Sequence, residues 1–320
     1  MSLRILNTIG EAFAPEAKEI LEKVGEVDYR IPSQDELYED IKNYDVVLVG
    51  LGLNIDQKVI DNGVALKAIA TATTGLDHID VKYAEEKKVD VLSLRGETEF
   101  LNTITGTAEL ACGLMIDLLR FTSHAFDSVK KYEWNRNAFR GHSLYGQTLG
   151  IVGMGRLGTW MARYGKAFGM TVVFYDPHIE ESTVSVEECT KVSFDELLEK
   201  SDVVSIHIHL LPETKHLFNK DALAKMKDSA YLVNTSRGSV VDEDELLKNL
   251  QQNKLAGYAT DVLAGELSFD KRFSNHPLVE YAKKNQNCII VPHIGGMTHE
   301  SRRMTDVFMA DKVQKYFTKQ

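Results

Sequence analysis

Short runs of β-branched and apolar residues alternate along this chain with segments of helical periodicity. Such alternation is typical of parallel βα units, and nearly continuous hydrophobicity within a run predicts a strand that is covered on both faces. The sequence therefore predicts an α/β fold with doubly wound parallel sheets. The predicted strands form two series, the first at 4–9, 45–50, 66–71 and 89–94, and the second at 148–153, 170–176, 202–210, 230–236, 255–262 and 287–293.

The two series of strands indicate two domains, which a chain of 320 residues is long enough to form. The apolar segment 102–135 lies between the series, and its spacing predicts one long helix that connects the domains. The last segment, 297–317, also has a helical pattern and is predicted to return to the first domain. We expect a first domain of residues 1–101 plus 294–320 and a second domain of residues 102–293.

Composition and charge argue against several classes of protein. The net charge of −10 is unlike that of a nucleic-acid binder, and no apolar run approaches the about 20 residues of a membrane helix. The N-terminus lacks the pattern of a signal peptide, so we expect a cytoplasmic protein that binds neither nucleic acid nor membranes. Cys112, Cys189 and Cys288 are odd in number and far apart, which predicts buried free thiols.

The sequence Gly-Met-Gly-Arg-Leu-Gly at 153–158 follows one predicted strand and precedes a segment of helical spacing. Alone, such glycines are as typical of a simple strand-turn-helix joint as of a phosphate site. The next strand, however, ends at Asp176, where an acid that binds the adenosine ribose is expected. This context favours a dinucleotide site in which Gly153 permits the turn, Gly155 admits the pyrophosphate and Gly158 lets the helix pack on the strand.

The residues near Asp176 indicate which dinucleotide binds. Its negative charge would repel the 2′-phosphate of NADP, and Pro177 and His178 follow it without a nearby arginine. The sequence therefore predicts NAD as the cofactor. His207 and His209 lie two residues apart on a predicted strand with no third ligand evident, so we expect no metal site.

Three residues suited to catalysis follow predicted strands of the second series, namely Arg237, Glu266 and His293. They belong to a set of motifs in a fixed order, TTGLDHID (73–80), TAELACGLM (107–115), the glycine turn with Asp176, NTSRGSVVDEDEL (234–246), DVLAGE (261–266) and PHIGGMT (292–298). On these motifs the chain resembles the family of D-isomer-specific 2-hydroxyacid dehydrogenases over nearly its whole length. The resemblance implies a flavodoxin-like substrate domain followed by a Rossmann NAD-binding domain.

The resemblance also implies a role for each matching residue. His293 matches the catalytic acid–base, Glu266 its carboxylate partner, and Arg237 the clamp on the substrate's carboxylate and carbonyl. The backbone N–H groups of Thr74, Gly75 and Leu76 are implied to meet the substrate carboxylate. Contacts to the cofactor are expected, from the glycine turn or from the resemblance, at Gly153, Gly155, Arg156, Leu157, Gly158, Asp176, Thr107, His207, Thr235, Ser236, Asp261 and Gly295.

These residue types suit the implied chemistry. Oxidising a secondary alcohol to a ketone requires a hydride acceptor and a base, and histidine exchanges protons near neutral pH. A neighbouring carboxylate favours the imidazolium form and orients the ring, and a guanidinium grips a carboxylate at two points. We therefore expect an enzyme that uses NAD to interconvert an (R)-2-hydroxyacid and its 2-oxoacid.

Other functions stay open on the sequence. A phosphoglycerate dehydrogenase is disfavoured because 48–54 carries no cation, although Arg95 could approach the substrate from another loop. A non-catalytic NAD-binding sensor, similar to corepressors related to this family, would keep the same dinucleotide site, and so would a formate or phosphite dehydrogenase. The resemblance further implies a homodimer with its contact region at 102–135. Leu267 departs from the family pattern, since proline is usual there.

Overall fold

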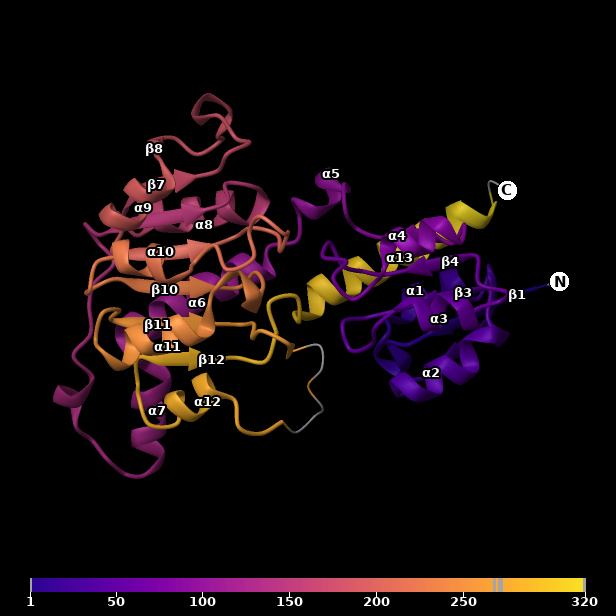
Figure 1. The fold of residues 1–320 in the computed structure, drawn as a ribbon, viewed down its shortest axis with the longest axis horizontal. Helices are drawn as coiled ribbons and strands as arrows, with labels where there is room; N and C mark the ends of the chain where they lie inside the picture. The colour runs from indigo at the N-terminus through magenta and orange to yellow at the C-terminus, as the bar shows by residue number, and fades with distance from the viewer. Residues whose placement is uncertain (1, 267–268, 270–272, 319–320) are drawn as a thin grey trace. The chain divides into compact units, whose positions relative to one another are not determined.

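The computed structural model describes residues 2–266, 269 and 273–318, so Leu267 lies outside the described residues. The chain divides into two compact units (Figure 1). The first unit comprises Met1–Ile104 and Met297–Gln320, and the second unit comprises Thr105–Gly296. Both boundaries lie a few residues beyond those we predicted. At the second boundary, the amides of Ile294 and Gly295 donate to Asp261, which holds the residues directly after His293 on the second unit.

The first unit has a five-stranded sheet in the order β2-β1-β3-β4-β5, with every strand pair parallel. This is the strand order of flavodoxin-like folds. Helices α2, α3 and α4 supply the core on one face, and α1 and α13 supply it on the other. The elements are β1 (Leu3–Asn7), η1 (Gly10–Ala12), α1 (Pro15–Leu21), β2 (Gly25–Tyr29), α2 (Gln34–Asp40), η2 (Ile41–Asn43), β3 (Val46–Leu48), α3 (Gln57–Asn62), β4 (Ala68–Ala70), α4 (Val81–Glu86), β5 (Asp90–Leu92), α5 (Thr98–Leu101) and α13 (His299–Thr318).

The second unit has a seven-stranded parallel sheet in the order β12-β11-β10-β9-β6-β7-β8. Counted from β6, this is the Rossmann order with one strand added at the end. Helices α6 and α8 cover one face, and α9 to α12 cover the other. The elements are α6 (Gly106–Arg120), α7 (Thr122–Lys130), η3 (Arg136–Phe139), β6 (Thr148–Val152), α8 (Arg156–Ala167), β7 (Thr171–Tyr175), η4 (Glu181–Thr183), β8 (Cys189–Lys191), α9 (Phe194–Lys200), β9 (Val203–Ile206), α10 (Lys220–Lys225), β10 (Tyr231–Asn234), η5 (Gly238–Val240), α11 (Glu243–Gln251), β11 (Gly257–Thr260), α12 (Pro277–Ala282) and β12 (Cys288–Ile290).

The predicted fold class is confirmed, and every predicted strand is present, although most are shorter than expected. Two strands were missed, β2 and β8, and both lie at a sheet edge. Their sequences, GEVDY and CTK, lack the continuous apolar character of buried strands because an edge strand is only partly covered. The strand predicted at 202–210 ends at Ile206, so His207 and His209 lie in the loop that follows β9.

The single long helix predicted at 102–135 is wrong, because the structure has two helices there. Phe121 ends α6 in the left-handed conformation, with φ of 56°, and α7 begins at the next residue. The chain then returns, and the amide of His142 donates to the carbonyl oxygen of Leu119 at 2.9 Å in the last turn of α6. A backbone group at the helix end is thereby satisfied where the helical pattern stops.

The structure tests the prediction that the three cysteines are buried free thiols. All three cysteines are free, but only Cys189 and Cys288 are buried, whereas Cys112 is half-buried. The predicted burial of Cys112 is therefore only partial.

Among the described residues, no helix combines the length and the apolar character that crossing a bilayer requires.

A buried carboxyl group in the first unit makes stability depend on pH. Asp306 on α13 is 1% exposed, and it accepts hydrogen bonds from Arg302 at 3.0 Å and from the amide of Ala14 at 3.3 Å. Burial raises the pKa of Asp306 from its ordinary 3.8 to about 6, an effect that the Arg302 charge and the Ala14 amide only partly oppose. The folded chain therefore binds this proton more tightly than the unfolded chain does.

This pKa predicts the pH response of an Asp306→Asn variant. The stabilising contribution of the protonated carboxyl group is complete below about pH 4 and is lost as the pH rises through about 6, a change of about 3 kcal/mol. Relative to wild type, Asp306→Asn should thus gain up to that amount of unfolding free energy between pH 4 and pH 7. Urea unfolding at a series of pH values measures it. Glu300→Gln, an exposed change on the same helix, is the control, and an equal pH response in both variants would contradict the prediction.

Candidate active site

The site is built on loops that follow parallel strands, which all end at the same edge of the seven-stranded sheet. Asn234, the last residue of β10, is fully buried and organises the turn that follows. Its side-chain oxygen accepts from the amide and the hydroxyl of Ser236 at 3.0 and 2.9 Å, and its side-chain nitrogen donates to the carbonyl oxygen of Arg237 at 3.0 Å. Its own carbonyl oxygen accepts from Thr260 and from the amide of Asp261, which joins this turn to the one after β11.

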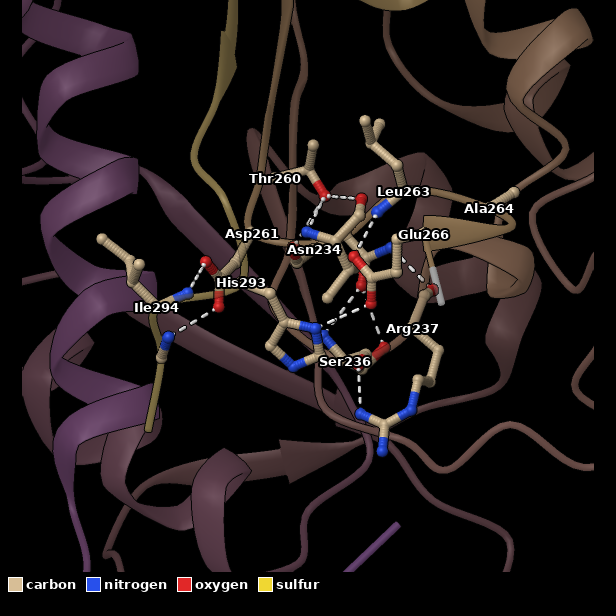
Figure 2. A network of polar contacts seen from close by, with 12 residues as sticks. Asn234, Ser236, Arg237, Thr260, Asp261, Leu263, Ala264, Glu266, His293 and Ile294 are labelled. Atoms are coloured by element: carbon tan, nitrogen blue, oxygen red, sulfur yellow. Dashed lines mark hydrogen bonds and ion pairs between the residues drawn. The ribbon is translucent and has the colours of Figure 1, made fainter. Parts of the chain in front are cut away.

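Glu266 and His293 form a hydrogen-bonded pair (Figure 2). The imidazole Nδ1 lies 2.7 Å from Oε1 of Glu266, and Oε2 of the same carboxylate accepts from the amide of Leu263 at 3.1 Å. Because a carboxylate only accepts, Nδ1 carries the hydrogen, and Nε2 of the neutral ring has a free lone pair. The two side chains are 18% and 27% exposed, so the pair is shielded while the ring stays accessible.

The backbone at His293 is held by Asp261. The amide of His293 donates to the carbonyl oxygen of Asp261 at 2.9 Å, and the Asp261 carboxylate accepts from the amides of Ile294 and Gly295 at 2.6 and 2.7 Å. His293 itself has φ of 52°, which is uncommon for a residue other than glycine. Burial raises the pKa of Asp261, and its two amide hydrogen bonds oppose that shift. This buried carboxyl group therefore stabilises the unusual backbone that presents the imidazole.

Arg237 lies in the turn after β10, half-buried, and its Nη1 donates to the carbonyl oxygen of Ser236 at 2.8 Å. In Figure 2 its guanidinium and the Nε2 edge of the His293 ring are both directed toward the lower side of the view. One fork of the guanidinium is thus held by the backbone, and the planar group can meet an anionic ligand. The structure thus brings the three predicted catalytic residues into one network (Figure 2).

The backbone of the glycine turn gives a steric reason for two of its three glycines. Gly153 has φ of 94°, and a Cβ there would lie 2.6 Å from the carbonyl oxygen of His207. A Cβ at Gly158 would collide with the carbonyl oxygen of Gly153, so only glycine lets α8 approach the turn. At Gly155 a Cβ would meet no described atom within 4 Å, which leaves the backbone open on that side.

The N-terminus of α8 fits a diphosphate. No side chain of the described residues caps this helix, its first turn carries no acidic residue, and Arg156 is its first residue. The N–H groups of the first helical turn and the positive end of the helix dipole therefore suit an anion. Asp176 lies close by, since its carboxylate accepts from the amide of Met154 at 3.0 Å and from the amide of His178 at 2.9 Å. The start of α8, which no described side chain caps, and the position of Asp176 beside the turn therefore fit a dinucleotide.

Among the other predicted cofactor residues, Thr107, Asp261 and Gly295 lie together, and His207 and Thr235 each have a buried polar atom without a hydrogen-bond partner among the described residues. Thr107 and Asp261 lie against Gly295, where a Cβ would approach both within about 3 Å. His207 hydrogen-bonds Ser205 at 2.8 Å through Nε2, and burial lowers its pKa to about 4, so it is neutral at pH 7. Its Nδ1 and the buried hydroxyl of Thr235 find no hydrogen-bond partner among the described residues. Buried polar atoms of this kind suit a polar ligand.

The predicted substrate residues and some unpredicted residues complete the description. Thr74, Gly75 and Leu76, predicted to bind the substrate carboxylate, belong to the first unit, and the catalytic residues belong to the second. The predictions missed Asn234, although a polar residue that ends an apolar run could have indicated a buried hydrogen-bonding role. They also missed Glu243, whose carboxylate accepts from the amide of Ala264 at 2.9 Å, because no pattern in the sequence distinguished it from its acidic neighbours. Among the described residues, no group of three or more potential metal ligands comes together.

Known proteins resemble this chain in sequence and in structure. Residues 112–295 match the model for the NAD binding domain of the D-isomer specific 2-hydroxyacid dehydrogenases. The D-3-phosphoglycerate dehydrogenase of Methanocaldococcus jannaschii is 34% identical over 302 residues, which cover 94% of this chain and 55% of that protein. The chain thus spans only about half the length of this relative.

Two further relatives are covered over most of their length. The hydroxypyruvate reductase of Thermotoga maritima is 35% identical over 282 residues, which cover 88% of both chains. The crystal structure of the D-lactate dehydrogenase of Aquifex aeolicus, complexed with NAD and lactic acid, superposes with a TM-score of 0.86 at 27% identity, covering 98% of this chain and 95% of that one. The chain therefore belongs to the family of D-isomer-specific 2-hydroxyacid dehydrogenases, and its second unit contains the NAD-binding domain of that family.

Proposed function

We propose that this protein is an NAD-dependent oxidoreductase that interconverts an (R)-2-hydroxyacid and its 2-oxoacid. The observation that carries the proposal is the Glu266–His293 pair, whose 2.7 Å hydrogen bond leaves Nε2 free in a network that also contains Arg237. An acid–base group, its carboxylate partner and a guanidinium are the groups that this reaction requires of a protein. Membership of the family supports the same reaction class.

The residues divide the work as follows. When bound, NAD accepts or supplies the hydride at the carbon that changes oxidation state. In oxidation, His293 Nε2 takes the proton of the substrate hydroxyl, and Glu266 stabilises the imidazolium that results. In reduction, the protonated His293 donates to the carbonyl oxygen. Arg237 binds the carboxylate and polarises the carbonyl beside it, so that the substrate is oriented before the proton moves.

The cofactor residues support NAD rather than NADP. Asp176 places a carboxylate beside the glycine turn, where its amide contacts with Met154 and His178 keep it in position. A negative charge there repels a 2′-phosphate and leaves acceptor lone pairs for ribose hydroxyls. The nicotinamide half of the cofactor is proposed to contact Thr107, Thr235, Ser236, Asp261 and Gly295. The phosphates and the adenosine half are proposed to contact Gly153, Gly155, Arg156, Leu157, Gly158 and His207.

The first unit is proposed to hold the substrate carboxylate through the backbone amides of Thr74, Gly75 and Leu76. Two hydrogen bonds hold this loop on its own unit. Thr73 donates from its hydroxyl to the carbonyl oxygen of Gly75 at 2.8 Å, and the amide of Leu94 donates to the carbonyl oxygen of Thr73 at 3.0 Å. A loop held in this way can present successive N–H groups to an anion without a side chain.

The test is a panel of 2-oxoacids assayed by NADH consumption, with NADPH in parallel. Suitable substrates are glyoxylate, pyruvate, hydroxypyruvate, phosphohydroxypyruvate and bulkier branched or aromatic acids, since two relatives are named for hydroxypyruvate and phosphoglycerate. We expect turnover of at least one acid with NADH and a lower kcat/KM with NADPH. NADH binding without turnover of any acid would instead indicate the sensor function, and oxidation of formate or phosphite would indicate those dehydrogenases.

We also propose that the protein is a homodimer that pairs through α7 and the segment after it. Tyr132 and Trp134 are 98% and 88% exposed, and Phe126 on α7 is 64% exposed. Figure 1 shows α7 and the chain after it to one side of the seven-stranded sheet. Large apolar side chains that cluster on one exposed segment are typical of a protein interface, and a second copy of the chain is the partner that the family resemblance implies.

Replacing Tyr132 and Trp134 together by serine should convert the dimer to a monomer at micromolar concentration. The reason is that aromatic side chains at the centre of an interface often contribute about 2 kcal/mol or more each to its binding free energy. Light scattering coupled to size exclusion measures the mass. Val64→Ser removes an equally exposed apolar side chain of the first unit and is the control. A wild-type protein that is monomeric at all concentrations would contradict the proposal.

A further inference from the structure

The turn that carries Glu266 is held by two carboxylates on adjacent amides. The amide of Leu263 donates to Glu266 Oε2 at 3.1 Å, and the amide of Ala264 donates to Glu243 Oε1 at 2.9 Å. Glu266 is thus part of the turn that it holds, whereas Glu243 contacts this turn from α11. Glu243 is the first residue of α11, which begins within the motif 234–246 that also contains Arg237. The Leu263 and Ala264 amides therefore connect the acid–base carboxylate to a second acidic residue that the mechanism does not use.

The Arg237 turn contacts the Leu263–Ala264 peptide from another side. A Cβ at Gly238 would collide with the amide nitrogen of Ala264 and with the carbonyl group of Leu263. Only glycine therefore allows the backbone directly after Arg237 to lie against this peptide. The peptide between Leu263 and Ala264 is in contact with the arginine turn at Gly238 and with α11 at Glu243.

The Glu243 carboxylate is itself enclosed. Its side chain is 13% exposed, and Oε2 lies 3.4 Å from Nε2 of His276, which directly precedes α12. The rings of Phe269 and Phe273 stack on each other and meet the His276 ring edge to face. Burial raises the pKa of Glu243, and the Glu266 charge adds to that shift while the Ala264 amide opposes it. Burial lowers the pKa of His276.

We propose that Glu243 is a positioning residue that keeps Arg237 and the Glu266–His293 pair in register through the Leu263–Ala264 peptide, with His276 enclosing its carboxylate. The expected effect of Glu243 on turnover rests on the proposed function, whereas its expected effect on the turn at 261–266 does not. In this role Glu243 acts through the amide of Ala264. Its effect is to fix the distance between the guanidinium turn and the acid–base turn, and transfer of a proton and a hydride is sensitive to errors of about 1 Å in such geometry.

Three variants separate this role from others. Glu243→Ala removes the acceptor of the Ala264 amide, and Glu243→Gln keeps a carbonyl acceptor while removing the charge. Asp244→Ala removes a charge from the next residue of α11, which is exposed, and is the matched control. We expect Glu243→Ala to lower kcat/KM about 10- to 100-fold and Glu243→Gln to stay within about threefold of wild type. Asp244→Ala should behave as wild type, and the Kd for NADH should not change in any variant.

Hydrogen exchange gives a readout that does not need turnover. In Glu243→Ala, the amides of residues 261–266 should exchange at least tenfold faster than in wild type, while β6, α8 and the other strands keep their protection. A loss of protection throughout the second unit, together with weaker NADH binding, would show a general structural role and overturn the proposal. So would wild-type kinetics in Glu243→Ala, or equal damage in Glu243→Gln. If the wild-type protein reduced no 2-oxoacid, the proposed function would fail, but the exchange experiment would still decide whether Glu243 holds the turn.

Discussion

Replacement of His293 by alanine is expected to lower kcat for 2-oxoacid reduction about 10²–10⁴-fold, which is the range that positioned acid–base groups contribute. The reason is that the carbonyl oxygen then gains no proton from Nε2 as the hydride arrives. The Glu266 carboxylate loses its partner at the same time, since the 2.7 Å hydrogen bond to Nδ1 is gone. Steady-state kinetics with saturating NADH measure the loss, and fluorescence titration should find the Kd for NADH within about twofold of wild type.

The effect of His293→Ala needs a control for the loss of a histidine. His299→Ala removes an exposed histidine at the start of α13 and should leave kcat unchanged. Thermal unfolding shows whether each variant keeps the stability of the wild-type protein. Unchanged turnover in His293→Ala would show that another group transfers the proton and that the assigned acid–base residue is wrong.

Replacement of Arg237 by alanine is expected to lower kcat/KM for the 2-oxoacid about 10²–10³-fold. The variant loses two charge-assisted hydrogen bonds to the substrate, each worth about 1.5–3 kcal/mol in such settings, although the remaining carboxylate contacts recover part of that energy. Arg237→Lys should recover only part of the activity, because an ammonium cannot form the two parallel bonds of a guanidinium. Kinetics across 2-oxoacid concentrations measure both variants.

Two further measurements make the Arg237 prediction specific. Added guanidine should restore part of the turnover of Arg237→Ala and none of the turnover lost in His293→Ala, since it replaces only the missing cation. Arg163→Lys is the control, because Arg163 on α8 donates a hydrogen bond to Ser185 and lies over the Trp160 ring, outside the network of Figure 2. This variant should behave as wild type. Equal kcat/KM for Arg237→Lys and wild type would show that the substrate carboxylate is held elsewhere.

The sequence was sufficient to predict the sheet architecture because its physical signal is local. Strands covered on both faces must be continuously apolar, and the runs around Ile151 and Val204 are, so nearly all strands were predicted in order. Edge strands β2 and β8 lack that requirement and were missed. The glycine turn was predictable from its motif, and the collision that excludes a side chain at Gly158 arises within that motif, with the carbonyl oxygen of Gly153. The collision at Gly153 is with His207, which follows β9, so it depends on the folded sheet.

The tertiary structure alone decided how the site is held. The pairing of Glu266 with His293 followed from the family resemblance. The contacts of Asn234 with Thr260, of Asp261 with Gly295, and of Glu243 with Ala264, however, join residues far apart along the chain. No periodicity encodes such contacts, because a buried polar side chain finds its partners only after the strands have set their loops side by side. The sequence by itself determined the fold class, the family and the residue types of the chemistry. The folded chain determined which polar groups hold the reacting residues, because burial makes an unpaired polar group costly and so fixes each one to a particular partner.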